Sequence, residues 1–388
     1  MTIAGAGAGA APLLSTAAVR ERSRNIVQAV DARASAHFRI ERSHLDDAAE
    51  WVVKVTRERY PDLVIPYHSR WRHFEAGGVD RIALVPQDPH ACIDLAVVSV
   101  LLDAGAGPDW TYHEHATGKT FTRSEGLGVA SLRAFADGAF SASADPFRVD
   151  AERLVEIDAA ALGDVFQVSD INPLVGLEGR AALLRRLGAA LGGRRPSAIY
   201  DALTASSRSV SVNAIVRALL DMLGPIWLTG STLDGVPLGD TWRHPHAGGE
   251  GESAGWVPFH KLTQWLAYSL LEPFEWAGVA LTDRDALTAL PEYRNGGLLL
   301  DTGVIAWRDP GEAARAWDVG SDLVVEWRAL TVALIDELAP RVRSALGKPD
   351  LPLACILEGG TWAAGRELAR EARNGNPPFA VRSDGTVF

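Results

Sequence analysis

Apolar residues recur at helical spacing along most of this chain. A period of three to four residues marks one buried face of an α-helix, whereas strict alternation marks a half-buried strand. From Ala17 onward the helical period dominates, and it predicts helices over 51–59, 91–102, 128–140, 150–162, 174–191, 211–223, 259–271, 323–346 and 362–373. The run 91–102 is apolar throughout, so this helix should be fully buried. We therefore expect a mainly α fold with a few short β pieces.

Strand-like pieces are few, the clearest being 225–229 and 298–305. They do not alternate regularly with helices, which disfavours a doubly wound parallel sheet. Residues 1–15 are rich in Ala and Gly and have little apolar surface to offset the entropy of ordering, so we expect a disordered tail. Residues 16–388 then form a single large helical domain, with a division into two lobes near 200–225 as an alternative. The Gly-rich stretch 244–255 is either a mobile lid or a surface loop.

Composition narrows the class of partner. The chain has 388 residues, 47% of them hydrophobic, and a formal net charge of −11. A strongly acidic chain is not expected to have the clustered basic surface that binding of nucleic acid requires. We therefore expect a small-molecule partner. Single arginines can bind a phosphate or carboxylate group of such a molecule. Cys92 and Cys355 are isolated, which indicates neither a disulfide framework nor a cysteine zinc site. No apolar run of about 18 residues suggests a membrane span, and no signal segment is evident, so a cytoplasmic location is expected.

Several catalytic motifs fail on counting. Gly118-Lys119-Thr120 resembles the end of a phosphate-binding loop, but His113 stands where that motif requires glycine. The G-x-S-x-G nucleophile elbow does not occur. His113-Glu114-His115 does not match HExxH, whose histidines stand four residues apart. Histidines at i and i+2 point to opposite sides of a helix, so they do not bind one metal ion from a helix. We expect no metal and no cofactor.

A dense polar and aromatic loop is the first candidate site. Within seven residues it holds two His, two Arg and a Trp, namely His68, Arg70, Trp71, Arg72 and His73. Arginine binds phosphate or carboxylate in a fixed fork, and histidine exchanges protons near neutral pH. The loop is thus a candidate for substrate binding. An exposed, salt-bridged loop is the alternative.

Two further stretches combine charged groups with helix starts. Lys261 and Gln264 lie at i, i+3 on one helix face, and a buried pair there would need partners such as a ligand. Glu292, Tyr293 and Arg294 precede two glycines, and a carboxylate held there could stabilise positive charge at an anomeric carbon or activate water. A surface lysine and an ordinary turn with a local Glu–Arg pair are the respective alternatives.

A third stretch, 357–362, places Glu358 and Trp362 around Gly359-Gly360-Thr361. Thr361 is a possible N-cap, and the glycines leave backbone N–H groups open to an anion or a second acidic group. Purely structural capping is equally compatible with this pattern.

These stretches carry a family resemblance. The segments PYHSRWRHFEAGGVDR, ATGKTFTRSEGLGVASLRAF, FHKLTQWLAYSLLEPFEWAG, LPEYRNGGLLLDTG and LEGGTWAAGREL resemble the uracil-catabolism (URC) family, encoded with genes for uracil breakdown in fungi and bacteria. The resemblance covers nearly the whole chain after the tail. It implies a pathway in which uracil becomes a nucleotide, its ring is opened, and a ribosylurea species must release urea.

A second resemblance, carried by FQVSDINPLVGLEGRAALLRRL and three of the same stretches, is to the queuosine salvage glycosidases. Those are helical proteins related to DNA glycosylases, so the resemblance implies a DNA-glycosylase-like architecture. By position, Lys261 matches a ligand-contacting lysine there. Glu292 stands where that family has a catalytic Asp, so its carboxylate reaches one methylene further.

The resemblance thus implies a hydrolase that cleaves the N-glycosidic bond of ribosylurea or its 5′-phosphate. Glu292 would support the transition state or activate water, and Lys261 or His68 would donate a proton to the leaving urea. Orientation of the substrate would fall to His68, Arg70, Arg72, His73, Asp170 and Lys261. Two alternatives stay open: a metal-dependent hydrolase of the urea-like group that uses the histidines, and a non-catalytic partner that channels the ring-opened intermediate.

Overall fold

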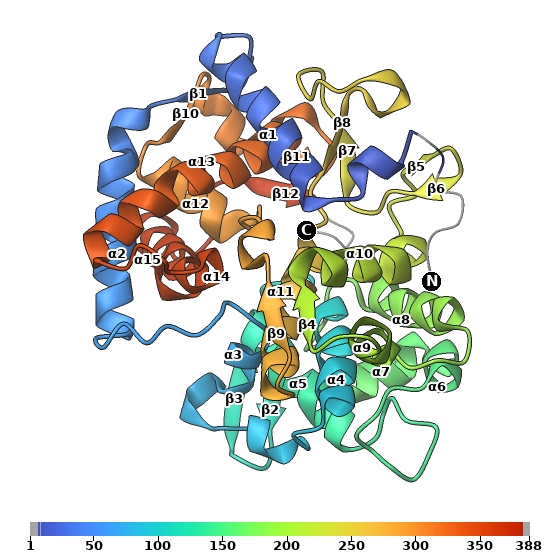
Figure 1. The fold of residues 1–388 in the computed structure, drawn as a ribbon. Coiled ribbons are helices and arrows are strands. Elements are labelled where there is room, and N and C mark those ends of the chain that lie inside the picture. The colour runs from blue at the N-terminus through green and yellow to red at the C-terminus, as the bar shows by residue number, and fades with distance from the viewer. Residues whose placement is uncertain (1–6, 8, 383–388) are drawn as a thin grey trace.

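Helices dominate the structure, a computed structural model that describes residues 7 and 9–382 (Figure 1). This confirms the mainly α fold class. The α-helices are α1 (Thr16–Asp31), α2 (Leu45–Arg59), α3 (Trp71–Phe74), α4 (Pro89–Leu101), α5 (Arg123–Ala136), α6 (Ala151–Glu156), α7 (Ala159–Val165), α8 (Leu177–Leu191), α9 (Ala198–Thr204), α10 (Val212–Leu223), α11 (Lys261–Trp276), α12 (Tyr293–Asp301), α13 (Asp322–Leu346), α14 (Leu353–Ile356) and α15 (Trp362–Arg373).

The fully buried helix expected at 91–102 is α4. Its first turn is set by Asp88, whose side chain accepts a hydrogen bond from the backbone N–H of Ala91, and by Pro89 at the first helical position. Every residue from Ala91 to Leu101 is buried. A helix that is apolar on all sides requires other elements around it, and α4 packs against α5, α8 and α11.

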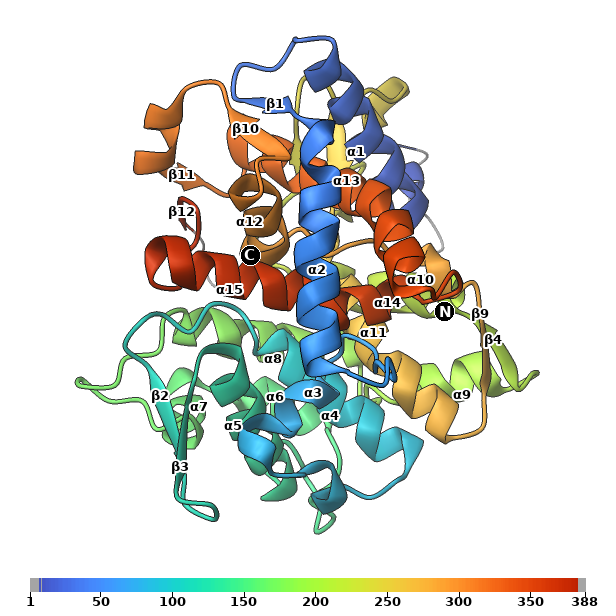
Figure 2. The same ribbon diagram turned by 90° about the vertical axis from the view of Figure 1, so that its left-hand side faces the viewer.

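Helices from the two ends of the chain pack against one another. Both α1 and α2 pack against α13, and α12 packs against α13 and α15. In Figure 2, α15 crosses the middle of the molecule, with α12 and α13 above it and α5 and α8 below it. The division into two lobes near 200–225 stays a prediction.

Strands are short and pair only in twos among the described residues. Four ladders are antiparallel, β1–β10, β2–β3, β5–β6 and β7–β8, and two are parallel, β4–β9 and β11–β12. The strands are β1 (Phe38–Ile40), β2 (Thr111–Glu114), β3 (Lys119–Thr122), β4 (Ser209–Ser211), β5 (Thr232–Leu233), β6 (Val236–Pro237), β7 (Thr241–Arg243), β8 (Trp256–Pro258), β9 (Ala280–Thr282), β10 (Ile305–Trp307), β11 (Ala316–Asp318) and β12 (Ala380–Arg382).

Both predicted strand pieces are wrong. Most of 298–305 belongs to α12 and the turn after it, and only Ile305 begins a strand. Short apolar runs do not distinguish a helix from a strand, and here burial of Leu298 and Leu299 within α12 decides for the helix. The stretch 225–229 begins as a 3₁₀ turn, Gly224–Ile226, because Pro225 suits the start of a helical turn and lacks the N–H that a ladder needs. The single helix expected over 150–162 is divided into α6 and α7 at Ile157, which is extended.

Part of the stretch predicted to be a disordered tail is ordered. Residues 1–6 and 8 lie outside the described residues, but Leu13 and Leu14 are buried in the core, and Ala11–Leu13 forms a 3₁₀ turn. The Leu13 carbonyl lies 2.9 Å from Nε2 of the buried His260. Two leucines supply the apolar surface that the Ala/Gly composition of the whole stretch obscured.

Across the described residues, none of the helices has the length and apolar character needed to cross a membrane.

Candidate active site

Glu292 is the N-cap of α12. Its carboxylate accepts hydrogen bonds from the backbone N–H groups of Asn295 (2.6 Å) and Arg294 (2.7 Å). The residue is only 8% exposed, so the carboxylate is fixed in position at the positive end of the helix dipole. Burial raises the pKa of Glu292, while the two N–H groups and the charge of Lys261 act in the opposite direction. A fixed, desolvated carboxylate of this kind can accept a proton or face a developing cation.

Lys261 opens α11, and its position is set by Asp240. The Asp240 carboxylate accepts a hydrogen bond from the Lys261 backbone N–H at 3.0 Å and is itself held by Arg328 at 2.8 and 2.7 Å. His260, directly before, adopts a left-handed backbone with φ +49°. Such strain in a non-glycine residue is common at functional sites.

Lys261 and Glu292 are electrostatically coupled. Burial lowers the pKa of Lys261. Three carboxylates raise it, and the effect of Glu292 is larger than those of Asp240 and Asp103. The first residue of α11 and the cap of α12 therefore interact through their opposite charges. The sequence proposed both residues, and the structure brings them together.

Asp103 joins this group, and sequence reasoning missed it. It lies just beyond α4 and forms an ion pair with the fully buried Arg70, Oδ1 to Nη1 3.0 Å. Arg70 also donates to Ser99 Oγ at 2.6 Å. Burial raises the pKa of Asp103 to about 6, although Arg70 and Lys261 oppose the shift. Its signal in the sequence was present: Asp103 is the first charged residue after the apolar run of α4.

Trp265 connects this group to the predicted histidine–arginine loop. It follows Lys261 by one helical turn, so both side chains share one face of α11. Its ring lies 5.6 Å from that of His73 and 6.4 Å from that of His68, and the Arg70 guanidinium carbon lies 5.5 Å from the Trp265 ring. Among the described residues, its buried indole N–H has no hydrogen-bond partner. Trp265 was not among the predicted site residues.

The loop and α15 line a cavity of about 480 Å³. Its lining includes the predicted residues His68, Arg72, His73, Glu358 and Trp362. The remaining lining residues are Arg59, Ala76, Gly77, Thr120, Phe121, Thr122, Glu125 and Arg366. The four predicted stretches therefore do not share one cavity, because Lys261 and Glu292 are not among the residues that line it.

Glu358 is the most strongly bound acid of the cavity. It pairs with His68 Nδ1 at 2.9 Å and with Arg59 at 2.8 Å, and the Tyr60 hydroxyl donates to it at 3.1 Å. Burial alone would raise the pKa of Glu358, but the His68 hydrogen bond and charge, followed by Arg59, hold it at about 2. His68 is thereby tied to a carboxylate, an arrangement that orients an imidazole.

The predicted N-cap at Thr361 is wrong. Residues Leu357–Thr361 form a π-helical segment that continues from α14 into α15, so no helix begins there. Gly359 and Gly360 pack against α2 and do not present their backbone to a ligand. A Cβ on Gly360 would lie 2.5 Å from the carbonyl oxygen of Val52 in α2, so only glycine allows this close approach. Wide turns of this kind occur often at functional sites, and this one directs Glu358 to the cavity.

Two predicted substrate-binding residues, Trp71 and Gln264, have contacts outside this cavity. Trp71 is completely buried, donates to the Ser269 carbonyl at 2.7 Å and packs on Phe74, so it belongs to the core. The Gln264 side chain forms hydrogen bonds with the Phe259 carbonyl and with Thr288, which lies four residues before Glu292. These hydrogen bonds fix the segment that precedes Glu292. Helical spacing could not reveal this burial, and a role of these two residues in substrate binding stays a prediction.

Asp170 is exposed on the loop between α7 and α8, and the contacts that join the other predicted residues do not include it.

Arg294 and Tyr293 flank the Glu292 cap. Arg294 is 2% exposed, and its guanidinium carbon lies 4.6 Å from the Tyr293 ring. Burial raises the pKa of Tyr293, with Arg294 opposing the shift. Arg72, the remaining predicted residue, pairs with Glu272 at 2.7 Å at the cavity wall.

The histidines outside this region do not gather. His113 and His115 lie on the β2–β3 hairpin, and buried His244 faces Glu326 across 3.5 Å. Within residues 7 and 9–382, no three His, Cys, Asp or Glu side chains are grouped closely enough to hold a metal ion.

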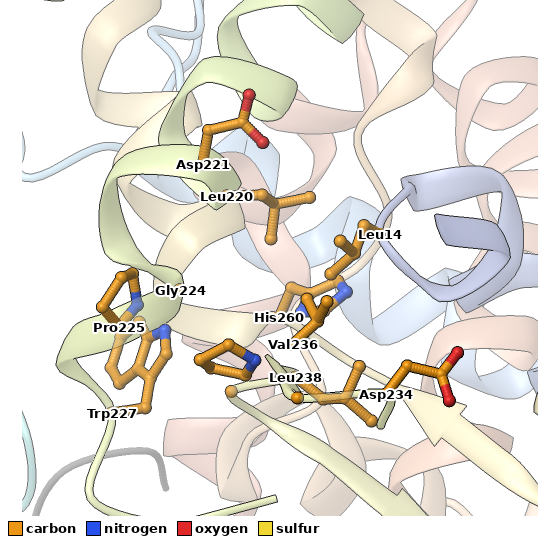
Figure 3. A pocket seen from close by; sticks show the side chains of 13 residues that line it. Leu14, Leu220, Asp221, Gly224, Pro225, Trp227, Asp234, Val236, Leu238 and His260 are labelled. Atoms are coloured by element: carbon orange, nitrogen blue, oxygen red, sulfur yellow. The ribbon is translucent and has the colours of Figure 1, made fainter. Parts of the chain in front are cut away.

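A second cavity, of about 270 Å³, is lined mostly by apolar residues. Leu14, Leu220 and Trp227 surround it, with His260 at its inner wall (Figure 3). None of the predicted site residues lines this cavity.

The fold and the site define a mainly helical protein in which the charges of Glu292, Lys261 and Asp103 interact near an aromatic and arginine-rich cavity. The chain belongs to the family described as "Protein of unknown function (DUF1688)", whose model matches residues 12–388. It is 39% identical to "Protein urg3" of Schizosaccharomyces pombe, with 97% of this chain and 98% of the relative covered. It is 38% identical to "Uracil catabolism protein 4" of Lachancea kluyveri, over 96% and 98% of the two chains. These matches confirm the predicted family.

Proposed function

We propose that the protein acts in uracil catabolism as an N-glycosidase that hydrolyses ribosylurea or its 5′-phosphate to urea and the sugar. The names of the relatives support the pathway, because one of them is called a uracil catabolism protein. The observation that carries the reaction is the buried carboxylate of Glu292, held by two backbone N–H groups and coupled to Lys261.

In this reaction the bond between ribose C1 and a urea nitrogen breaks, and its electron pair stays with the nitrogen. Positive charge grows at C1 and the ring oxygen, and Glu292 offsets it. Water then forms the new bond to C1 and passes its proton to Glu292. The leaving nitrogen must take a proton from an acid, because urea leaves poorly as an anion.

We add Asp103 to the candidate proton donors. Lys261 and His68 were expected for this role, and Asp103 is a third candidate because it is buried near Lys261 and has a pKa of about 6. A carboxylic acid with such a pKa is partly protonated near neutral pH and is a stronger acid than an ammonium group. We assign the proton transfer to Asp103, with Lys261 orienting both carboxylates.

The test is direct. Purified protein is incubated with ribosylurea and with its 5′-phosphate, and urea is measured. Glu292→Gln should lower the rate at least about 100-fold, since a positioned general acid or base contributes that much or more. Glu371→Gln, on the exposed face of α15, is the matched control and should retain full activity. Wild-type protein that binds both compounds yet releases no urea would overturn the assignment and favour a non-catalytic partner.

A further inference from the structure

The cavity between the histidine–arginine loop and α15 concentrates arginines although the chain is acidic. Arg59, Arg72 and Arg366 line it in a protein of net charge −11, and each of them is paired with a carboxylate. Arg366 is half exposed, with its side chain 50% accessible, and it pairs with Glu125 at 2.7 Å. Exposed pairs of this kind contribute little and exchange readily for a more highly charged partner.

A helix start faces the same cavity. Helix α5 has 14 residues, its first turn includes Glu125, and its N-cap Thr122 makes no side-chain capping hydrogen bond. Thr120, Phe121, Thr122 and Glu125 all belong to the cavity lining. The first N–H groups of a helix have no partner within the helix, and together with the helix dipole they favour an anion.

His73 supplies an independent indication of a ligand. It is 8% exposed, it lines the cavity, and its Nδ1 has no hydrogen-bond partner among the residues that the structure describes. A buried polar atom without a partner is costly, so such atoms commonly meet a ligand or water. Gly128 of α5 allows this placement, because a Cβ there would lie 2.8 Å from the His73 Cβ.

Trp265 adjoins both the cavity and the proposed reaction centre. Its ring lies 5.6 Å from that of His73, which lines the cavity, and it follows Lys261 by about one turn of α11.

We propose that this cavity binds the phosphate of a sugar phosphate, so that the substrate is the 5′-phosphate ester and not the free N-riboside. The inference rests on the glycosidase function proposed above. Arg366, Arg72, the α5 N-terminus and His73 Nδ1 bind the phosphate, which displaces Glu125 from Arg366. The Trp362 ring forms the wall beside Arg366, whose guanidinium carbon lies 5.4 Å from it.

Binding is measured first, without turnover. Ribose 5-phosphate, inorganic phosphate and ribose are titrated calorimetrically into the wild-type protein, Arg366→Gln and Arg341→Gln. Arg341 pairs with Asp46 on the exterior and serves as the matched control. Ribose 5-phosphate should bind at least about tenfold more tightly than ribose, and Arg366→Gln should remove most of that difference while Arg341→Gln leaves it unchanged. Equal binding of ribose and ribose 5-phosphate, or equal effects of the two variants, would overturn the proposal.

Turnover then separates this proposal from the function on which it rests. The kcat/KM for the phosphorylated riboside should exceed that for the free riboside, and Arg366→Gln should reduce the preference mainly through KM. Equal kcat/KM values for both substrates would sink the phosphate site and leave the glycosidase standing. Arg366-dependent binding of ribose 5-phosphate without any hydrolysis would support the phosphate site and overturn the glycosidase.

Discussion

Asp240 joins Arg328 of α13 to the first residue of α11. One carboxylate accepts two hydrogen bonds from Arg328, at 2.8 and 2.7 Å, and another from the backbone N–H of Lys261 at 3.0 Å. Burial would raise the pKa of Asp240, but Arg328 and these hydrogen bonds lower it. The position of the proposed catalytic lysine thus depends on a buried ion pair between distant parts of the chain.

Asp240→Ala should destabilise the protein by about 3–5 kcal/mol, because it leaves the guanidinium of Arg328 buried without its counter-charge. The midpoint of chemical denaturation measures this loss. Asp46→Ala, which removes the exposed partner of Arg341, is the control and should leave the midpoint unchanged. Equal midpoints for Asp240→Ala and the wild type would show that the pair does not support the fold.

Glu292 has two separable roles, and two substitutions distinguish them. Glu292→Ala removes both the charge and the cap of α12, so it should cost about 0.5–2 kcal/mol in stability as well as activity. Glu292→Gln keeps an oxygen that can accept from the Arg294 or Asn295 N–H, so it should retain most of the stability and lose urea release. If both variants released urea as fast as the wild-type protein, Glu292 would act only as the cap of α12.

Helical spacing carried the fold prediction because period and burial agree over long segments such as α4, α13 and α15. It failed where short segments depend on tertiary packing: α12 is a helix because it packs between α13 and α15, and the wide turn at Glu358 depends on α2 approaching two glycines.

The sequence draws attention to chemistry-bearing residues where they cluster along the chain, and their roles stay predictions. Lys261 and Glu292 were found by their stretches, and the structure couples them. Asp103 and Trp265 were missed because each is a single residue beside an apolar run, and only the fold brings them to the histidine–arginine loop. Trp71 was assigned to the substrate because a loop sequence does not reveal which of its aromatic side chains turns into the core.

Acidic pH should act on stability through Glu358. Its folded pKa of about 2 lies below the ordinary glutamate value of about 4.3, so the stability it contributes is present above that value and is lost as pH falls toward 2. Glu358→Gln should therefore lower stability at pH 6 and flatten the acid limb of a denaturation profile measured from pH 5 to 2. A variant whose acid limb matches the wild type would contradict the role of the His68 and Arg59 contacts.

Asp103 should act in a different window and with the opposite sign. Its folded pKa of about 6 lies above the unfolded value of about 3.9, so its contribution is complete below pH 4 and is lost as pH rises through 6. If Asp103 is the proton donor, kcat should also fall above an apparent pKa near 6, and Asp103→Asn should lose both this limb and most activity. Retention of the limb in Asp103→Asn would assign it to another group.

Gly360 tests how closely α2 must approach the π-helical segment. An added Cβ would lie 2.5 Å from the Val52 carbonyl oxygen and 2.6 Å from Thr56 Oγ1, closer than atoms can pack. Gly360→Ala should therefore cost about 1–3 kcal/mol and weaken urea release, because α2 carries Arg59, the partner of Glu358. Gly297→Ala in α12 is the matched control: its nearest neighbour, Pro378 Cδ, is 3.7 Å away, so the methyl group fits and the gain in helix propensity should leave stability equal or higher. Denaturation midpoints for the two variants measure the difference, and a Gly360→Ala protein as stable as Gly297→Ala would show that α2 can move away without loss.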